Sequence, residues 1–210
     1  MQCALPHGTR PGLVLAGGLS RRMGVSKPDL SFDGSSLLAF VARRLAAQVS
    51  DLAVNADGGS ATELSLPVVP DIIPGHAGPL SGVLAGLRHF EARCPAASHM
   101  ITVPVDGPFF PVDLANRLME FADGDAIAIA TSSGRVHPVF AAWPFSLADD
   151  LGSWLADPEN RRLTSFLARH LHREVAFPLI DTPLRPVDPF FNINTPADLD
   201  EAVSLLDAIR

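Results

Sequence analysis

The sequence contains little cysteine, little lysine and no long hydrophobic run, and each shortage excludes a class of protein. Its two cysteines, Cys3 and Cys94, form neither a CxxC pair nor a zinc-like spacing, and nothing in the sequence supports a disulfide between them. No apolar run is long enough to cross a bilayer. The first residues lack the basic-then-apolar order of a secretory signal, so we expect a cytoplasmic protein without membrane contact.

Positive charge is also scarce. The chain has 16 lysine or arginine residues against 23 acidic ones, and its net charge of −7 argues against a general nucleic-acid-binding protein. Among those 16 basic residues, Lys27 is the single lysine. A small phosphorylated ligand is still compatible with this charge, because Arg21, Arg22 and Lys27 form a local basic cluster.

What the sequence does contain is typical of one globular domain. Hydrophobic residues occupy 47% of the 210 positions and charged residues 19%, which is ordinary for a folded domain. We find no repeat, low-complexity tract or linker that would divide the chain. A single domain over residues 1–210 is therefore predicted.

Short apolar runs alternate with amphipathic helical patterns along the chain. The apolar runs are continuous, as expected for strands covered on both faces, and they span residues 12–16, 52–56, 66–70, 99–104, 126–131 and 136–143. Helical patterns occupy residues 36–49, 79–93, 111–122 and 195–209, and Ser35 or Ser36 is the expected cap of the first. This alternation predicts a doubly wound, three-layer α/β/α domain with a mostly parallel sheet, which binds ligands at the carboxyl ends of its strands.

Proline and threonine mark where these helices begin. Pro79 and Pro111 stand in the first turn of two helical patterns, where the missing N–H costs nothing. The last pattern has Thr195 as its N-cap, Pro196 at the first helical position and Asp198 three residues after the cap. These residues predict a variant of the capping box.

The segment "LAGGLSRRMGVSKPDL", residues 15–30, follows the first strand, and helical patterning resumes only near Ser35 or Ser36. A loop of about eighteen residues is unusual in a compact domain unless it is functional. Its glycines allow N–H groups to turn toward an anion, and its basic residues supply charge for phosphates. The spacing is neither the GxGxxG of dinucleotide sites nor the GxxxxGK[ST] of P-loops, so both of those classes are excluded.

The order LAGG-x3-RMG-x2-K in this loop resembles the signature of the nucleotidyltransferases with a Rossmann-like fold. Within them, the sequence is most similar to the molybdenum cofactor guanylyltransferase family, of the MobA type. Four further segments fall in that family's order along nearly the whole chain: "VNAD", "VVPDIIPGHAGPLSGVLAGL", "VPVDGPFFPVDL" and "FNINTPADL". The resemblance implies an N-terminal half that binds the nucleotide and a C-terminal half that binds the acceptor.

The resemblance also implies which residues bind the nucleotide. Lys27 and Arg22 would offset phosphate charge, and Asp106 would be both catalytic and the ligand of Mg²⁺. The nucleotide-binding positions implied are Leu15, Ala16, Gly17, Gly18, Lys27, Asn55, Asp71, Gly78 and Asp106. Taken alone, Asp106 is better explained as a turn aspartate or helix cap, and Asn55 and Asp71 are typical of turns at strand ends.

Acceptor-binding residues are implied in the C-terminal half. His137 lies in the family's "HP" element, although a core histidine is an equally good interpretation. Arg161 and Arg162 match a basic segment, although a solvated pair is the default for such residues. Asn192 and Asn194 are expected at a strand end, where helix capping is the stronger expectation and an amide oxygen can bind Mg²⁺ only weakly.

From this resemblance we predict an enzyme that transfers GMP from GTP to the terminal phosphate of Mo-molybdopterin and releases pyrophosphate. Its implied partners are GTP, Mo-molybdopterin, a cofactor-delivery protein and molybdoenzyme chaperones, without nucleic acid or membrane. One alternative is a cytidylyl- or sugar-phosphate nucleotidyltransferase of the same fold, which "LAGG" rather than "LAAG" disfavours. The other is a non-catalytic protein that binds GTP or molybdopterin.

Overall fold

The computed structural model describes residues 9–17, 27–56, 64–73 and 78–209. The strands in this part of the chain are β1 (Pro11–Leu15), β2 (Ser31–Phe32), β3 (Ser35–Ser36), β4 (Asp51–Asn55), β5 (Val68–Val69), β6 (His99–Pro104), β7 (Ile127–Ser132), β8 (Arg135–Pro144) and β9 (His172–Ala176). The helices are η1 (Lys27–Asp29), α1 (Leu37–Ala46), α2 (Pro79–Arg93), α3 (Leu114–Phe121), η3 (Phe145–Leu147), α4 (Ala148–Leu155), α5 (Leu163–Leu167) and α6 (Pro196–Ile209).

Seven of these strands form one sheet in the order β5-β4-β1-β6-β8-β7-β9. Every neighbouring pair is parallel except the two pairs that involve β8, which runs against β6 and β7. In the middle of the sheet, Leu15 at the end of β1 lies opposite both Asn55 of β4 and Pro104 of β6. Three strands therefore end at the same edge, as predicted for a ligand site in this fold class.

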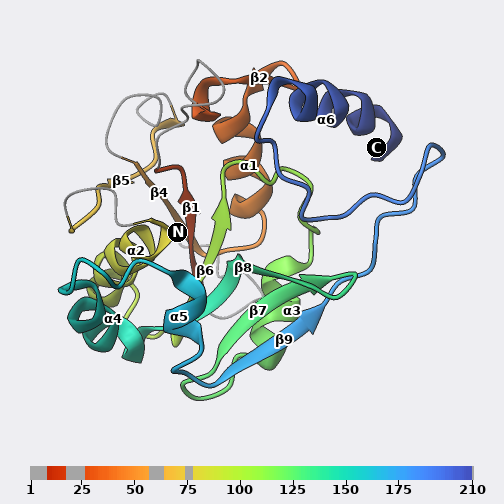
Figure 1. The fold of residues 1–210 in the computed structure, drawn as a ribbon. Helices are drawn as coiled ribbons and strands as arrows, with labels where there is room; N and C mark the ends of the chain where they lie inside the picture. The colour runs from red at the N-terminus through yellow and green to blue at the C-terminus, as the bar shows by residue number, and fades with distance from the viewer. Residues whose placement is uncertain (1–8, 18–26, 57–63, 74–77, 210) are drawn as a thin grey trace.

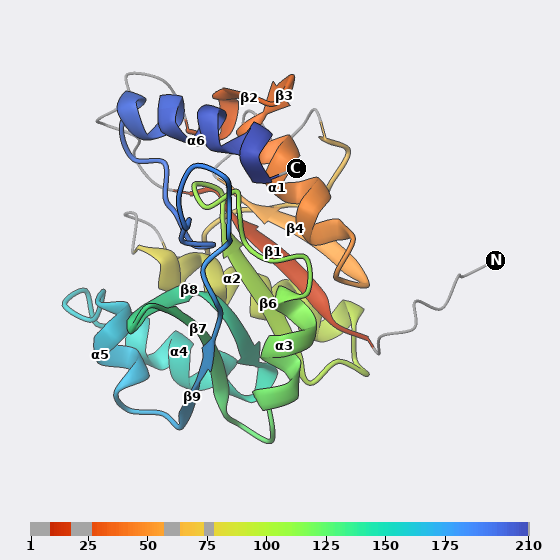
Figure 2. The ribbon, with the colours of Figure 1, turned by 90° about the vertical axis from the view of Figure 1, so that its right-hand side faces the viewer.

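Helices cover both faces of the sheet, which gives the predicted three layers (Figures 1 and 2). On one face, α1, α3 and α6 contribute to a buried apolar cluster with one set of inward strand residues. On the other face, α2, α4 and α5 pack against the alternate residues of the same strands. None of the described helices is long and apolar enough to span a membrane.

The alternation of strand and helix fails at one place. The apolar runs 126–131 and 136–143 have no helical pattern between them, and β7 and β8 form an antiparallel hairpin in which Ser132 pairs with Arg135. Its two-residue turn has positive φ at both positions, 47° at Ser133 and 75° at Gly134, as in the tight turns whose twist matches that of paired strands. The strand β9 was not predicted, because four of its five residues are exposed and it lacks an apolar run.

Three further local features differ from the prediction. The third long helix begins at Leu114 rather than at Pro111, whose carbonyl accepts a hydrogen bond from the Leu114 N–H at 3.1 Å. The long loop after β1 contains η1 and the small β2–β3 hairpin before α1 begins. Residues 191–194 form no strand, although Asn192 and Asn194 are expected at a strand end.

The predicted caps are confirmed. Ser36 caps α1 by accepting a hydrogen bond from the Ala39 N–H at 3.2 Å. At the start of α6, the Thr195 hydroxyl accepts from the Asp198 N–H, and the Asp198 carboxylate accepts from the Thr195 N–H at 2.8 Å. This reciprocal pair is a capping box in which aspartate replaces the usual glutamate.

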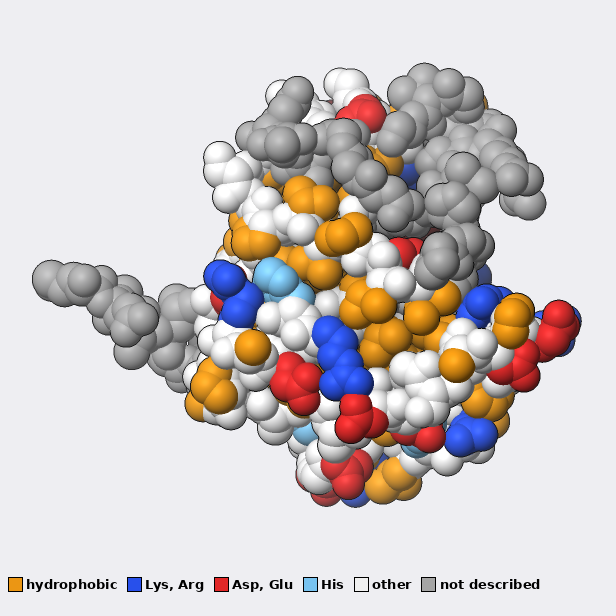
Figure 3. Space-filling view, turned by 90° about the vertical axis from the view of Figure 1, so that its left-hand side faces the viewer, with side chains coloured by type: hydrophobic (Ala, Val, Ile, Leu, Met, Phe, Trp, Pro, Cys, Tyr) orange, Lys and Arg blue, Asp and Glu red, His pale blue; other side chains and the backbone are white. Residues whose placement is uncertain are grey.

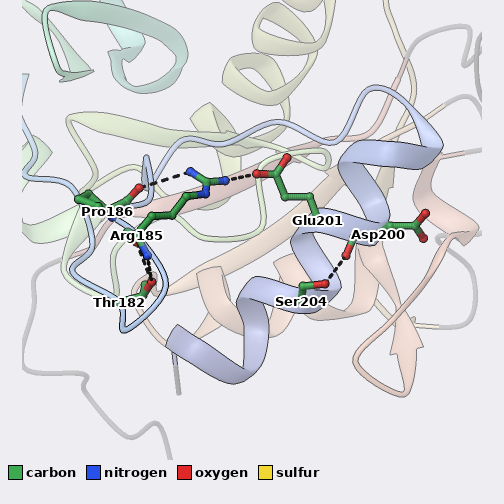
Figure 4. A network of polar contacts seen from close by, with 6 residues as sticks. All are labelled: Thr182, Arg185, Pro186, Asp200, Glu201 and Ser204. Carbon is green, nitrogen blue, oxygen red and sulfur yellow. Dashed lines mark hydrogen bonds and ion pairs between the residues drawn. The ribbon is translucent and has the colours of Figure 1, made fainter.

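A polar network fastens the loop before residue 188 to α6, as Figure 4 shows. Arg185 forms an ion pair with Glu201 on the helix and donates to the Pro186 carbonyl. Thr182 closes the loop on itself by donating its hydroxyl to the Arg185 carbonyl at 2.7 Å. The loop that leads into the segment 188–194 is thus joined to α6.

Candidate nucleotide-binding site

The ends of β1, β4 and β6 continue to bond to one another beyond the sheet. The Ala16 N–H donates to the Asn55 carbonyl at 2.9 Å, and the Val105 N–H donates to the Leu15 carbonyl at 3.0 Å. These bonds hold the first residues of two loops side by side. Asp106, the next residue along, is therefore carried on rigid backbone.

Lys27 lies at the centre of this edge. Its Nζ donates to Asp106 Oδ2 at 2.8 Å and to Asn194 Oδ1 at 2.8 Å, although these partners are 79 and 167 residues away in the sequence. The ion pair is shielded from solvent, with side chains only 18% and 22% exposed. The single lysine of the chain thus joins two other predicted site residues, Asp106 and Asn194.

The segment that carries Asn194 is fixed by backbone bonds. The Ile193 N–H donates to the Asp106 carbonyl at 2.8 Å, and the Asn194 N–H donates to Asp198 Oδ2 at 2.9 Å. The bond from the Asn194 N–H is the largest cause of the lowered pKa of Asp198, and the bond from the Thr195 N–H lowers this pKa further. Asn194 therefore lies just outside a helix cap and not at a strand end, which leaves its side chain directed at Lys27.

Asn192 supplies a second amide beside Asp106. Its Oδ1 is buried and has no hydrogen-bond partner among the described residues. A Cβ at Gly107 would come within 3.3 Å of this oxygen and within 2.5 Å of Phe140 Cζ, so a side chain does not fit there. Gly107 thus leaves room for the Phe140 ring and for the Asn192 carboxamide beside Asp106.

Asn55 and Asp71 form a second amide–carboxylate pair at the same edge. The Asn55 Nδ2 donates to Asp71 Oδ1 at 2.9 Å and to the Val69 carbonyl at 3.0 Å. Asn55 is buried, with 3% of its surface exposed, whereas Asp71 is partly exposed. The pair presents a carboxylate to solvent and hides the amide that holds it.

Of the predicted loop glycines, two are described. Gly17 is exposed directly after Ala16, and a Cβ there would lie 3.3 Å from Asn55 Oδ1. Gly78, before α2, has φ of 74°, which favours glycine, and a Cβ there would lie 3.7 Å from the Arg161 carbonyl. Gly18, Arg21 and Arg22 lie outside the described residues.

The predicted acceptor residues lie in two different environments. Arg161 is half-buried and donates to the Leu155 carbonyl at 3.0 Å, whereas Arg162 is exposed and precedes α5. His137 is buried, and its ring packs on Phe190 at 4.7 Å between centroids. Burial lowers the pKa of His137, so the imidazole is held neutral, as in a core histidine.

The comparisons with known proteins bear on this arrangement of residues. The model of the MobA-like NTP transferase domain matches residues 12–175. A molybdenum cofactor guanylyltransferase from Rhizobium rhizogenes is 52% identical over 202 residues, covering 95% of this chain and 94% of that protein. A second, from Rhizobium meliloti, is 51% identical and covers 93% of this chain and 91% of that protein. The chain belongs to the MobA-like NTP transferase family.

Solved structures of the family and its fold agree with this membership. The molybdopterin-guanine dinucleotide biosynthesis protein A from Archaeoglobus fulgidus superposes with a TM-score of 0.71 at 25% identity, covering 94% of this chain and 98% of that chain. The CMP:2-keto-3-deoxy-manno-octonic acid synthetase in complex with CTP has a TM-score of 0.70 at 12% identity, covering 95% and 98% of the two chains. The second likeness shows the fold alone.

Among the residues that the structure describes, the oxygen donors beside Lys27 are the Asp106 carboxylate and nearby amides. Among the described residues, no three histidine, cysteine, aspartate or glutamate side chains gather as a metal cluster. Asp106 keeps Oδ1 while Lys27 takes Oδ2, and the buried Asn192 Oδ1 has no partner in that part of the chain. Hard oxygen donors of this kind, completed by substrate phosphates and water, fit Mg²⁺.

Two polar residues at the edge were not singled out from the sequence. Ser132, at the end of β7, donates its hydroxyl to Asp188 Oδ1 at 2.8 Å and also contacts His137 Nε2 at 2.8 Å. Asp188 accepts a further bond from the Phe190 N–H. No motif marks these residues, because their contact depends on the β7–β8 hairpin, which the alternating pattern did not predict.

Proposed function

We propose that this chain transfers GMP from GTP to the terminal phosphate of Mo-molybdopterin, forming the guanine dinucleotide cofactor and pyrophosphate. Support comes from its family membership and from relatives named molybdenum cofactor guanylyltransferase. The observation that carries the proposal is the convergence of Lys27, Asp106 and Asn194 at the carboxyl ends of the central strands. These are the residue types that phosphoryl-type transfer uses, because such reactions depend on positioning and charge neutralisation.

The reaction needs no general base from the protein. The acceptor phosphate is largely ionised at neutral pH, so it attacks the α-phosphorus of GTP in line while the bond to the β-phosphate oxygen breaks. Lys27 is placed to neutralise charge on the phosphates, and the backbone N–H groups from Leu15 to Gly18 are expected to hold them. Arg22 is expected to add positive charge from the same loop.

We propose Mg²⁺ as the metal of the reaction. Asp106 would hold it, with the amide oxygens of Asn192 and Asn194 as weaker ligands or as partners of its water molecules. Bound there, the ion supplies Lewis-acid stabilisation of the charge on the transferring phosphate. Lys27 bonds to the same carboxylate, so it restrains Asp106 and adds a second positive charge at one position.

Asp71 is the residue that we propose selects the guanine base. An ionised carboxylate only accepts hydrogen bonds, and guanine presents N–H donors along its base-pairing edge. Cytosine and uracil do not present the same pair of donors, so discrimination of roughly 10²-fold or more is available from such a contact. Asn55 holds Asp71 in place for it.

We propose that the acceptor approaches from the side of Arg161 and Arg162. Gly78 and Arg161 are adjacent, which brings the proposed nucleotide and acceptor residues together. Figure 3 shows one face of the molecule, where basic side chains, with acidic ones among them, lie beside a hydrophobic area. The guanidinium groups of Arg161 and Arg162 would suit an acidic pterin phosphate. Protein partners that deliver or receive the cofactor remain part of the proposal.

The test is pyrophosphate release with GTP, CTP, ATP and UTP, each with and without molybdopterin and Mg²⁺. We expect release with GTP and acceptor only. Equal turnover with CTP would replace the guanine assignment with a cytidylyltransferase. Tight GTP binding without release under any condition would favour the non-catalytic carrier.

A further inference from the structure

The Asn55 carboxamide is oriented by its two acceptors. Its Nδ2 faces the Val69 carbonyl at 3.0 Å and Asp71 Oδ1 at 2.9 Å, and neither partner can donate. The nitrogen must therefore face this side, and both of its N–H groups are used. The side-chain nitrogen then has no donor left for a nucleotide, so its task is to hold Asp71.

The oxygen of the same amide is directed at helix α2. A Cβ at Gly82 would lie 2.3 Å from Asn55 Oδ1 and 2.8 Å from its Cγ, closer than atoms can approach. The Leu15 Cδ2 would also be only 2.7 Å away. Gly82 and its neighbour Ser81 are buried in the first turns of the helix, so the helix cannot retreat without leaving the sheet.

We propose that Gly82 is a positioning residue for the nucleotide site: without a side chain, it admits the Asn55 carboxamide that holds Asp71. The inference rests on the proposed function, in which Asp71 contacts the base. A side chain at position 82 forces the amide to rotate, and rotation breaks the two bonds to Val69 and Asp71. Asp71 is then free to move away from the base.

Gly86, one helical turn further along α2, provides a matched control. A Cβ there would lie 2.6 Å from Leu13 Cδ2 and 2.7 Å from Met100 Sδ, so it crowds the same helix–sheet interface. Those atoms are the ends of flexible apolar side chains and make no polar contact with the site. Both glycine-to-alanine changes carry the same gain in helix propensity, so the two variants differ mainly in what they crowd.

The experiment compares Gly82→Ala, Gly86→Ala and Asn55→Ala. GTP affinity is measured by calorimetry with Mg²⁺, and pyrophosphate release gives kcat and KM for GTP. We expect Gly82→Ala and Asn55→Ala each to raise the Kd and KM for GTP about tenfold, the scale of one lost charged hydrogen bond, with kcat changed less than threefold. Gly86→Ala should stay within about twofold of the parent chain in both constants.

The double variant Asn55→Ala/Gly82→Ala distinguishes positioning from general damage. If Gly82 acts through Asn55, the second change adds little, and the Kd stays about tenfold above that of the parent chain instead of about a hundredfold. Independent effects that multiply would overturn the inference. So would a Gly82→Ala variant that binds GTP as the parent chain does, or equal losses in Gly82→Ala and Gly86→Ala.

Two outcomes separate this inference from the proposed function. A parent chain that binds GTP but releases no pyrophosphate ends the transferase proposal, and the calorimetric comparison still decides the role of Gly82. A parent chain that binds no guanine nucleotide overturns both. If Gly82→Ala fails to fold, Asn55→Ala breaks the same contact without crowding, and normal GTP affinity in that variant would refute the inference.

Discussion

Two aspartates at the same edge of the sheet are held by different kinds of donor. Asp71 is held by the neutral amide of Asn55, whereas Asp106 is held by the ammonium of Lys27. The charge of Asp106 is thus balanced by a cation of the chain itself, while Asp71 has no lysine or arginine partner among the described residues. A carboxylate whose charge is balanced by a lysine suits a site that must hold both phosphates and a metal ion. A carboxylate without a cationic partner suits the binding of an N–H donor of a base.

The largest expected effect concerns the balanced aspartate. Asp106→Ala should lower turnover by about 10²–10³-fold, since both the proposed metal ligand and the partner of Lys27 are lost. Steady-state pyrophosphate release over a range of Mg²⁺ concentrations measures it, and chelation of the metal should stop the parent chain as well. Asp113→Ala, an exposed carboxylate without a side-chain cap bond, is the control. Activity near that of the control would remove Asp106 from the site.

The second-largest expected effect concerns Lys27, the cation that balances the charge of Asp106. Lys27→Ala should lower kcat/KM for GTP by about a hundredfold, because a charged group that bonds to Asp106 and Asn194 is lost. Lys27→Arg should recover less than a tenth of the loss, because a planar fork does not replace a compact ammonium between two acceptors. Full rescue by arginine would show that only the charge matters, and the comparison of the two aspartates would then need revision.

The unbalanced aspartate should control selectivity more than rate. Asp71→Asn replaces a pure acceptor with a group that also donates, so kcat/KM for GTP should fall about tenfold or more while CTP use stays low and unchanged. Competition between GTP and CTP in one reaction measures the ratio directly. Equal losses for the two nucleotides would place Asp71 outside base recognition.

The smallest expected effect is on stability, and it concerns Asp198 in the N-terminal cap of α6. Asp198→Ala should cost about 1 kcal/mol in the free energy of unfolding, because it removes the capping carboxylate. Backbone hydrogen bonds lower the pKa of Asp198, so its contribution is present above the ordinary aspartate range and is lost as the pH falls through the lowered pKa. Urea unfolding at pH 7 and near pH 3 should show a larger difference between the parent chain and Asp198→Ala at pH 7 than at pH 3. Asp200→Ala, exposed on the same helix, is the control.

Much of the fold could be predicted because its signals are local. Continuous apolar runs marked β1, β4 and β6, and the caps of α1 and α6 stand at the predicted residues. The reversal of β8 could not be predicted from periodicity, since a strand buried on both faces has the same pattern in either direction. The turn at Ser133 and Gly134 was the available signal for it.

The site was predicted by a different route. Lys27, Asp106 and Asn194 were selected by resemblance to a family, and the structure brings them within hydrogen-bond distance. The role of Gly82 could not be predicted, because Gly78, Gly82 and Gly86, four residues apart on a helix, indicate close packing without showing which neighbour each one admits. That neighbour, Asn55, is 27 positions earlier in the chain and on another element.

The bonds of Lys27 also have a consequence for the order of folding. They join positions 79 and 167 residues apart, so they can form only after the central strands have paired and the segment before α6 has docked. We therefore expect the reactive centre to be assembled late in folding and to open before the sheet does. A chain whose last helix has detached would keep most of its core. Lys27, however, would have lost its hydrogen bond to the Asn194 side chain, which orients the ammonium group.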